Sequence, residues 1–297
     1  MILLIPAHAG GGRTGSAVPP AEGEDNMKTS ASLAYQTDSG FAPFAAADFQ
    51  RGLDWAASLG FDGVEPIIQY PDRVDADQLN AQLDQRGLVA STIATGQMAG
   101  EGLVFCSPAE EIRRGAVERI CRHIDLADRL VGRPHVTIGL ARGKGDPARA
   151  VQQLAWTDAC VAACAEYAAK KNIVLNLEPI NRYECALMNS TAEGAEMMER
   201  IGNPSHIGIL YDTFHSNIED PDPIGAIRRY GGQIAHVHFA DSNRRVPGGG
   251  HIPFDAIVRA LREAGYDGFV SLEVLNLPDA EAVRAQAGAV NRLVKNL

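Results

Sequence analysis

The stretch Ile173-Val174-Leu175-Asn176-Leu177-Glu178-Pro179 places a carboxylate directly after a short apolar run. Such a run is typical of a parallel strand that is covered on both faces. Because Pro179 has no N–H to donate to a neighbouring strand, we predict that the strand ends at Glu178. A carboxylate at the end of a buried strand is stable only when a cation or a hydrogen-bond donor meets it. Glu178 is therefore expected to be either a structural ion-pair partner or a ligand.

Short apolar runs of this kind alternate with amphipathic stretches from Thr29 onward. The predicted strands are 30–35, 64–68, 88–94, 136–140, 173–178, 207–212, 234–239 and 269–273. The predicted helices are 45–59, 78–86, 108–130, 151–170, 192–201, 223–230, 254–264 and 280–295. This alternation predicts a (β/α)₈ TIM barrel. A doubly wound sheet is the alternative, but no Gly-x-Gly-x-x-Gly motif follows the first strand.

Residues 1–27 lack this pattern, because the segment 9–26 is rich in Gly, Pro and charged residues and has no periodicity. The apolar run at residues 1–5 is too short for a signal sequence and has no basic leader. We predict that 1–27 is a flexible N-terminal extension, with Met27 as a plausible natural start. Residues 28–297 are then expected to form a single barrel domain.

Composition narrows the class of protein. The chain has 297 residues, of which 45% are hydrophobic and 22% charged, as in an ordinary globular protein. Its net charge of −10 disfavours a nucleic-acid partner, because phosphate binding needs a basic surface. No apolar run approaches the roughly 20 residues that span a bilayer, so no membrane association is expected. The five cysteines have no paired spacing, which predicts free thiols and a cytoplasmic location.

Polar side chains end the last four predicted strands: Glu178, Asp212, His238 and Glu273. Residues at the C-terminal ends of barrel strands converge on one mouth. Three crowded carboxylates would raise one another's pKa unless a cation relieved the repulsion. Three oxygen donors and one imidazole nitrogen suit one divalent ion of the Mn²⁺, Mg²⁺ or Co²⁺ kind better than structural Zn²⁺, and we take Mn²⁺ as the first choice.

Each of these residues also has an ordinary structural explanation. Asp212 could cap a helix that begins at Thr213, and His236 or His238 could be a hydrogen-bonded barrel residue. His236 faces the same side of its strand as His238 but lies deeper, so we assign the ligand role to His238. Four such coincidences at consecutive strand ends favour the metal site.

Four longer motifs surround these residues: Leu177-Glu-Pro-Ile-Asn-Arg-Tyr-Glu184, Asp212-Thr-Phe-His215-Ser-Asn-Ile-Glu219, His236-Val-His238 and Ser242-Asn-Arg244-Arg-Val-Pro-Gly. They resemble the ketose 3-epimerases of the D-tagatose/D-psicose type, within the xylose isomerase-like TIM barrel superfamily. Three further segments are similar to the 5-keto-L-gluconate epimerase branch: Thr95-Gly-Gln97, Glu111-Ile-Arg113 and Gly139-Leu-Ala-Arg-Gly143. The resemblance runs from about Thr29 to Glu273.

The resemblance implies a divalent-metal-dependent epimerase that inverts C3 of a ketose or keto-sugar acid. The metal would hold the C2 carbonyl and C3 hydroxyl oxygens and act as a Lewis acid. Glu178 and Glu273 would approach opposite faces of a planar cis-enediolate. One would remove the C3 proton and the other would return a proton to the far face. Chemistry on a single face would only restore the starting sugar.

The resemblance also implies substrate contacts. Arg244 and His215 would hydrogen-bond the C2 oxygen, and Glu184 would contact the hydroxymethyl end. The alternative for Arg244 is a surface ion pair with Asp241 or Asp220, and for Glu184 a solvated acid.

Arg142 and Lys144 follow the fourth predicted strand at the mouth. They could bind a substrate carboxylate, as the similarity to keto-gluconate enzymes suggests, or only solvate a loop. Whether the sugar is free, acidic or phosphorylated therefore stays open. Relatives of this kind commonly form dimers or tetramers, so a homo-oligomer is expected.

Other functions use the same barrel. An aldose–ketose isomerase or a C-glycoside-cleaving lyase would also enolise a metal-bound sugar, and the motifs do not separate these enzymes. An endonuclease IV-like nuclease would need several metals, many more His ligands and a basic face. A non-catalytic sugar-binding barrel would need a broken ligand set, whereas this set is intact.

Overall fold

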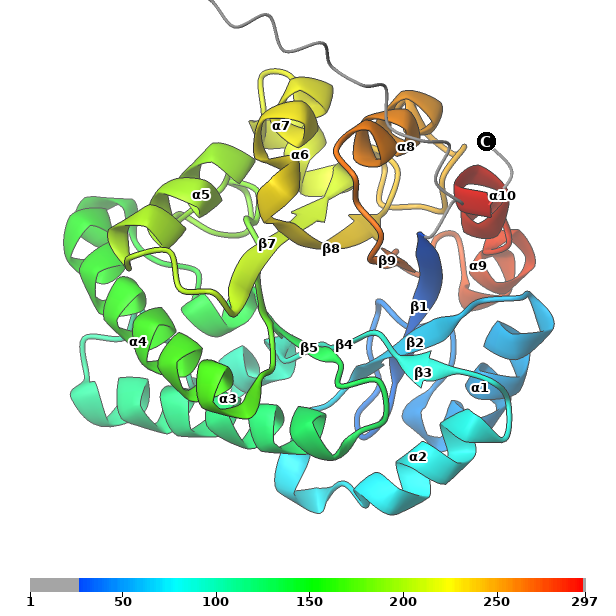
Figure 1. Cartoon of the computed structure of the whole chain (residues 1–297), viewed down its shortest axis with the longest axis horizontal. Coiled ribbons are helices and arrows are strands. Elements are labelled where there is room, and N and C mark those ends of the chain that lie inside the picture. Colours follow the sequence, from blue (N-terminus) through cyan, green and yellow to red (C-terminus); the bar gives the residue numbers. More distant parts are fainter. Residues whose placement is uncertain (1–26, 296–297) are drawn as a thin grey trace, which may run out of the picture.

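The computed structural model describes residues 27–295, and the predicted (β/α)₈ barrel is confirmed there. All neighbouring strands are parallel. They lie in the order β3-β2-β1-β9-β8-β7-β6-β5-β4. Because β3 leads almost directly into β4, the sheet closes on itself (Figure 1). Of the predicted extension, residues 1–26 lie outside the described range, and Met27 packs into the core.

The strands begin and end near the predicted positions, with one difference. Residues 88–94 form two short strands separated by Ser91. The Ser91 N–H donates to the Val64 carbonyl at 2.9 Å, and the Ser91 carbonyl accepts from the His135 N–H at 3.3 Å. Ser91 therefore stays hydrogen-bonded to the strands on both of its sides. The strands are β1 (Lys28–Ala34), β2 (Gly63–Ile67), β3 (Val89–Ala90), β4 (Thr92–Ile93), β5 (His135–Ile138), β6 (Leu175–Leu177), β7 (Ile207–Asp212), β8 (Ile234–Phe239) and β9 (Phe269–Leu272).

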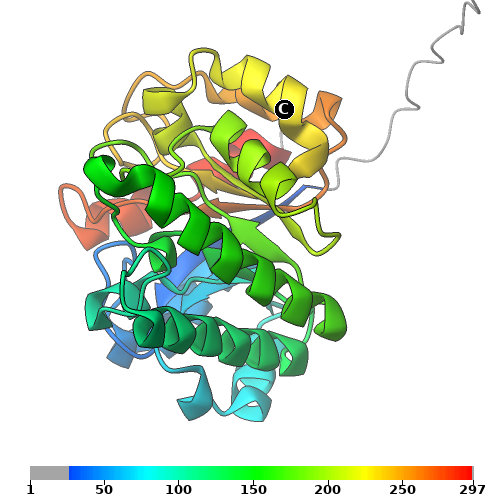
Figure 2. The ribbon, with the colours of Figure 1, turned by 90° about the vertical axis from the view of Figure 1, so that its left-hand side faces the viewer.

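Helices surround the sheet on its outer side (Figures 1 and 2). The predicted last helix, 280–295, is two helices that are interrupted at Ala287 and Gly288. No helix in the described part of the chain is both long and apolar enough to cross a bilayer. The helices are α1 (Phe49–Ser58), α2 (Ala76–Asp84), α3 (Glu110–Arg129), α4 (Ala150–Lys171), α5 (Thr191–Arg200), α6 (Thr213–Glu219), α7 (Pro223–Tyr230), α8 (Phe254–Glu263), α9 (Ala280–Gln286) and α10 (Ala289–Lys295).

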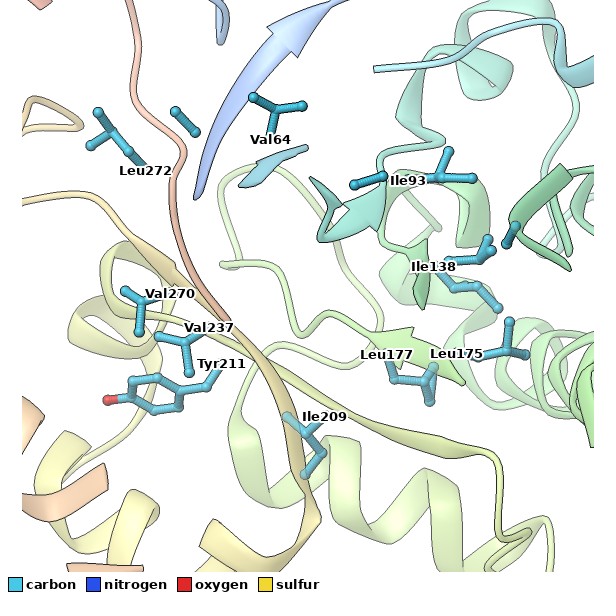
Figure 3. Close-up of a cluster of buried hydrophobic side chains, with 14 of the residues drawn as sticks. Val64, Ile93, Ile138, Leu175, Leu177, Ile209, Tyr211, Val237, Val270 and Leu272 are labelled. Atoms are coloured by element: carbon cyan, nitrogen blue, oxygen red, sulfur yellow. The ribbon is translucent and has the colours of Figure 1, made fainter. Parts of the chain in front are cut away.

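The main apolar core lies between the sheet and the helices. Leu175 and Leu177, alternate residues of β6, are fully buried, and so is Ile209 of β7. Figure 3 shows these three side chains together with their counterparts on neighbouring strands. Replacing one such leucine by alanine typically costs about 2–5 kcal/mol of stability. Because successive side chains of a strand point to opposite sides, the residues between them face the barrel interior.

The barrel interior is polar toward the N-terminal ends of the strands. Asn176 of β6 donates to Thr92 Oγ1 of β4 at 3.1 Å, which places both side chains inside the barrel. The Asn176 Oδ1 atom lies 3.0 Å from Nδ1 of His135. Such contacts satisfy polar groups that cannot reach water. All five cysteines have free thiols, as predicted.

We predict that His135 makes the protein sensitive to acid. Burial, together with the neighbouring His236, lowers the pKa of His135 to about 4. The unfolded chain binds a proton at this residue below about pH 6.5, whereas the folded chain does so only near pH 4. The contribution of His135 to the free energy of unfolding is therefore complete above about pH 6.5. As the pH falls toward 4, up to about 3 kcal/mol of it is lost.

Urea unfolding at about pH 7.5 and about pH 5 measures this loss. The difference in unfolding free energy between the two pH values should be smaller for His135→Gln than for the wild type. The exposed His251 offers a control, since His251→Gln should leave the difference unchanged. Equal acid losses in wild type and His135→Gln would contradict the prediction.

Candidate metal and active site

Four side chains meet at the mouth of the barrel. Glu178 directly follows β6, Asp212 ends β7, His238 is the next-to-last residue of β8, and Glu273 directly follows β9. One ligand atom from each residue lies within 4.8 Å of the other three. The structure thus brings together the four residues singled out at consecutive strand ends. We refer to them below as the carboxylate–histidine cluster.

The cluster fits a divalent cation. His238 Nδ1 lies 3.6 Å from Glu178 Oε1, 3.8 Å from Asp212 Oδ2 and 3.4 Å from Glu273 Oε2. This buried nitrogen has no hydrogen-bond partner among residues 27–295, an arrangement that is unfavourable unless a cation or donor takes up its lone pair. These four side chains would hold one divalent cation, whose charge would offset that of the three carboxylates.

Asp212 uses its two carboxylate oxygens for different purposes. Oδ1 accepts hydrogen bonds from the N–H groups of Phe214 and His215 at 2.7 and 3.2 Å, and so caps α6. Oδ2 faces the cluster. Capping and cluster membership, which the sequence offered as alternatives, therefore occur together. Burial opposes ionisation of Asp212, but the Arg244 guanidinium outweighs it and holds the pKa of Asp212 below the ordinary value.

Glu65 of β2 is a site residue that the sequence analysis missed. Its Oε2 atom lies 3.1 Å from His238 Nε2, and both side chains are buried. A metal-binding imidazole commonly donates its second N–H to a carboxylate, which fixes the ring and leaves the other nitrogen for the ion. Burial alone would raise the pKa of Glu65, but His238 and His236 hold it well below its usual range. The available signal was a charged residue inside an otherwise apolar strand.

His236 occupies the deeper position expected for it. Its Nε2 atom lies 3.0 Å from Ser271 Oγ and 3.5 Å from Glu65 Oε2. It therefore belongs to the layer beneath the carboxylate–histidine cluster, and the ring that faces the three carboxylates is that of His238.

Arg244 lies at the edge of the cluster. Its Nη1 atom is 2.8 Å from Asp212 Oδ2, and its Nη2 atom is 3.1 Å from Glu273 Oε2. Its guanidinium carbon lies 5.2 Å and 4.6 Å from the ring centroids of Phe41 and Phe214. The side chain is buried, so the surface ion pair considered as an alternative is not formed. A carboxylate oxygen has two lone pairs and can accept from Arg244 while it binds an ion.

His215 and Glu184 are connected through Asn181. His215 Nε2 lies 3.9 Å from Glu178 Oε1 and 3.8 Å from Asp212 Oδ2, beside the cluster. Glu184 is exposed and accepts a hydrogen bond of 2.8 Å from Asn181 Nδ2.

Arg142 does not face the cluster, and its suggested role in binding a substrate carboxylate is not supported. The side chain is fully buried and donates to the main-chain carbonyls of Glu178 and Leu187. A guanidinium held in this way supports the chain segment that carries Glu178. Lys144 is exposed.

A cavity of about 650 Å³ opens over the cluster. Glu178, His238 and Glu273 line this cavity. The Glu178 and Glu273 side chains are 10% and 17% exposed, whereas that of Asp212 is 0% exposed. The two glutamates are thus the cluster carboxylates that a bound molecule can reach. The rest of the wall comes from loops after other strands, including Phe41, Gln69, Thr95, Gln97, Glu101 and Leu140.

Comparison with known proteins agrees with this geometry. Residues 53–293 match a family model described as the xylose isomerase-like TIM barrel. The chain is 31% identical over 262 residues to the D-psicose 3-epimerase of Enterocloster bolteae, which covers 83% of this chain and 82% of the relative. It is 34% identical over 235 residues to the L-ribulose 3-epimerase of Mesorhizobium japonicum, with coverage of 78% and 77%.

The chain belongs to the ketose 3-epimerase family of xylose isomerase-like TIM barrels. The resemblance inferred from the sequence motifs is thereby confirmed, and the protein is an enzyme of the isomerase class. A solved structure of D-allulose 3-epimerase from Methylomonas sp. in complex with D-allulose shares the fold. Its TM-score is 0.77 at 22% identity, with coverage of 92% of this chain and 97% of that one.

We predict that Gly139 is needed for the position of Glu178. A Cβ atom on Gly139 would lie 2.2 Å from Glu178 Oε2. Gly139→Ala should therefore displace this carboxylate and lower kcat/KM by about 100-fold, since displacements near 1 Å have effects of that size. The family activity on a ketose, measured together with thermal unfolding, tests this.

Gly96 provides a matched control in the same cavity wall. A Cβ atom there would lie 4.0 Å from Leu140, which is an ordinary contact. Gly96→Ala should therefore keep activity close to that of the wild type. If Gly139→Ala were equally active, the Glu178 carboxylate would not depend on this close approach.

Proposed function

We propose that this enzyme inverts C3 of a neutral ketose in a reaction that depends on one divalent metal ion. The proposal rests on one observation, namely that the carboxylates of the cluster differ in their access to the cavity. Glu178 and Glu273 are the cluster carboxylates that line the cavity, while Asp212 is fully buried and His238 adds a nitrogen ligand between the two glutamates. Three carboxylates and one imidazole favour Mn²⁺, with Mg²⁺ or Co²⁺ as alternatives.

Glu178 and Glu273 would act as the two acid–base groups. They belong to β6 and β9, with β7 and β8 between them, so they approach the cavity from different sides of His238. One carboxylate would take the C3 proton as the enediolate forms, and the other would return a proton to the opposite face. A bound divalent ion would supply Lewis-acid stabilisation of the negative charge on the neighbouring C2 and C3 oxygens.

Three side chains at the edge of the cluster would orient the sugar. Arg244 and His215 lie close enough together to donate to one oxygen, with Arg244 Nη2 3.4 Å from His215 Nε2. We assign this oxygen to C2 of the ketose. Glu184 lies at the exposed side of the same group, and we assign to it the hydroxymethyl end of the substrate.

The charges of the cavity wall support a neutral substrate. Asp38, Glu65, Glu101, Glu178 and Glu273 line it, and none of the described lining residues is Lys or Arg. Like charges brought together cost several kcal/mol, so a carboxylate or phosphate on the sugar would be disfavoured. A neutral ketose is therefore favoured over the acidic substrate suggested by the similarity to the 5-keto-L-gluconate enzymes.

Other enzymes can be separated from this proposal by their products. An aldose–ketose isomerase would give an aldose from the same ketose, and a C-glycoside-cleaving lyase would release an aglycone. The relatives described above are named as 3-epimerases. The net charge of −10 and a cluster with one imidazole ligand argue against an endonuclease IV-like reaction.

We predict that Glu178→Gln and Glu273→Gln each abolish epimerisation but preserve part of the proton exchange. Either variant should lower kcat/KM by about 100-fold or more, because one proton-transfer group is lost. Each should still exchange the C3 hydrogen with deuterium oxide, from a different epimer in each case. NMR of the sugar and calorimetric Mn²⁺ titration measure exchange and metal binding separately.

Asp212→Asn is the comparison variant, since it should weaken Mn²⁺ binding and exchange for both epimers. Chelation of the wild type should likewise remove activity, and added Mn²⁺ should restore it. Full epimerisation by either glutamine variant, or activity that survives thorough chelation, would refute the proposal.

We also predict strong discrimination by substrate charge. The kcat/KM for a neutral ketose should exceed that for its terminal phosphate, and that for a keto-sugar acid, by about 100-fold or more, in line with repulsion of a few kcal/mol. Initial rates with the three substrates at one ionic strength test this. Comparable rates with the anionic sugars would show that the acidic wall does not select the substrate.

A further inference from the structure

Asn181, in the loop after β6, has a fixed side-chain orientation. Its Oδ1 atom accepts from the Tyr183 N–H at 3.0 Å, and a main-chain N–H can only donate. Its Nδ2 atom lies 2.8 Å from Glu184 Oε1, and a carboxylate oxygen accepts. In the reversed orientation the amide NH₂ would face the Tyr183 N–H, and the amide oxygen would face the Glu184 carboxylate. Both contacts would be repulsive. Nδ2 must therefore be the group that faces His215 Nδ1, at 2.7 Å.

This orientation determines where His215 carries its proton. Its Nδ1 atom receives the Asn181 amide and also lies 3.3 Å from the Asn181 main-chain N–H. Two donors on Nδ1 require that this nitrogen be unprotonated. In the neutral imidazole the hydrogen is then on Nε2, the atom that points toward Glu178 and Asp212.

Within residues 27–295, no acceptor lies at hydrogen-bond distance from the Nε2–H group. The carboxylate oxygens of Glu178 and Asp212 are 3.9 and 3.8 Å away. Arg244 Nη2, at 3.4 Å, would favour an unprotonated Nε2, but this contact is the longest of the three nitrogen contacts to the ring. The same Nη2 atom already donates to Glu273.

We propose that Asn181 is a positioning residue that holds His215 in the Nε2–H form, so that His215 donates a hydrogen bond to the substrate and does not act as a base. The buried Asn181 amide connects Glu184 at the exposed side with His215 at the cluster. The Asn181 side chain thereby orients both Glu184 and His215. The inference rests on the proposed function for the identity of the substrate oxygen, but the assignment of the proton is independent of it.

Two variants distinguish this role from simple space filling. Asn181→Asp keeps the shape but offers His215 an acceptor, so at about pH 9, where an imidazole is neutral, the proton should move to Nδ1. Asn181→Ala loses the shape but leaves the main-chain donor, so the Nε2–H form should largely persist. The expected order of kcat is wild type, then Asn181→Ala, then Asn181→Asp, with a loss of about tenfold or more for the last. Space filling alone would reverse the order of the two variants.

The proton position is measured directly by ¹H–¹⁵N correlation of the histidine rings in Mg²⁺-loaded protein, with His215→Gln for assignment. Asn189→Asp is the control, because Asn189 donates to the Ile180 and Cys185 carbonyls of the same loop and makes no hydrogen bond to His215 within residues 27–295. This control should leave the His215 tautomer unchanged.

A wild-type Nδ1–H, or an Asn181→Asp variant with unchanged tautomer and kcat, would overturn the inference. If Asn181→Asp does not fold, the wild-type spectrum together with the kcat of Asn181→Ala decides. An Nε2–H form in an enzyme that turns over no ketose would instead defeat the proposed function and leave the role of Asn181 intact.

Discussion

The burial of several carboxylates at one end of the barrel is the constraint on which the site depends. Glu65 and Asp212 are removed from water, and an unpaired buried carboxylate is strongly unfavourable. His238 meets this constraint on two sides, since Nε2 faces Glu65 and Nδ1 faces the three cluster carboxylates. Arg244 compensates part of the remaining charge. A divalent ion would compensate more, so metal binding and the stability of the folded site are expected to be coupled.

The surrounding main chain is adapted to this cluster. Gly139 leaves the space that the Glu178 side chain occupies, and Arg142 holds the Glu178 carbonyl from behind. Arg244 has a φ of 60°, a left-handed conformation that costs a non-glycine residue about 1 kcal/mol or more. That cost is tolerated because the conformation brings the guanidinium between two aromatic rings and onto two cluster carboxylates. Gly139 and Arg142, to which no ligand contact is assigned, therefore help to decide the position of Glu178.

The sequence predicted those features that follow from chain direction alone. Parallel strands end at one edge, so Glu178, Asp212, His238 and Glu273 could be placed together from their positions after apolar runs. The closed barrel followed from the alternation of strands and helices. Glu65 escaped because it lies within β2 rather than at its end, and its partner is on β8, across the barrel. Only the closed sheet brings those two strands face to face.

Other features depend on atoms that a sequence pattern does not describe. The basic character of Arg142 suggested an anion site, but its guanidinium is taken up by main-chain carbonyls, which every sequence contains. Likewise, Asn181 could be read as a loop residue until the direction of its amide was fixed by the Tyr183 N–H. A sequence pattern does not show the direction of a hydrogen-bond donor or acceptor, so features that depend on this direction could not be predicted.

The separation of cluster and cavity wall has a consequence for substrate choice. The cluster comes from β6 to β9, whereas Gln69 and the segment Gly96–Glu101 belong to loops after β2 and β4. Glu101 is held there by Arg119 at 3.2 Å and by Gln69 at 2.8 Å, without contact to any cluster residue among the hydrogen bonds and ion pairs of the described chain. Glu178 and Glu273, which would transfer protons, therefore lie on one half of the barrel. Gln69 and Glu101, which would contact the far end of the sugar, lie on the other half. Substitutions at Gln69 or Glu101 are therefore expected to alter which ketose is accepted without breaking the ion pairs of the cluster.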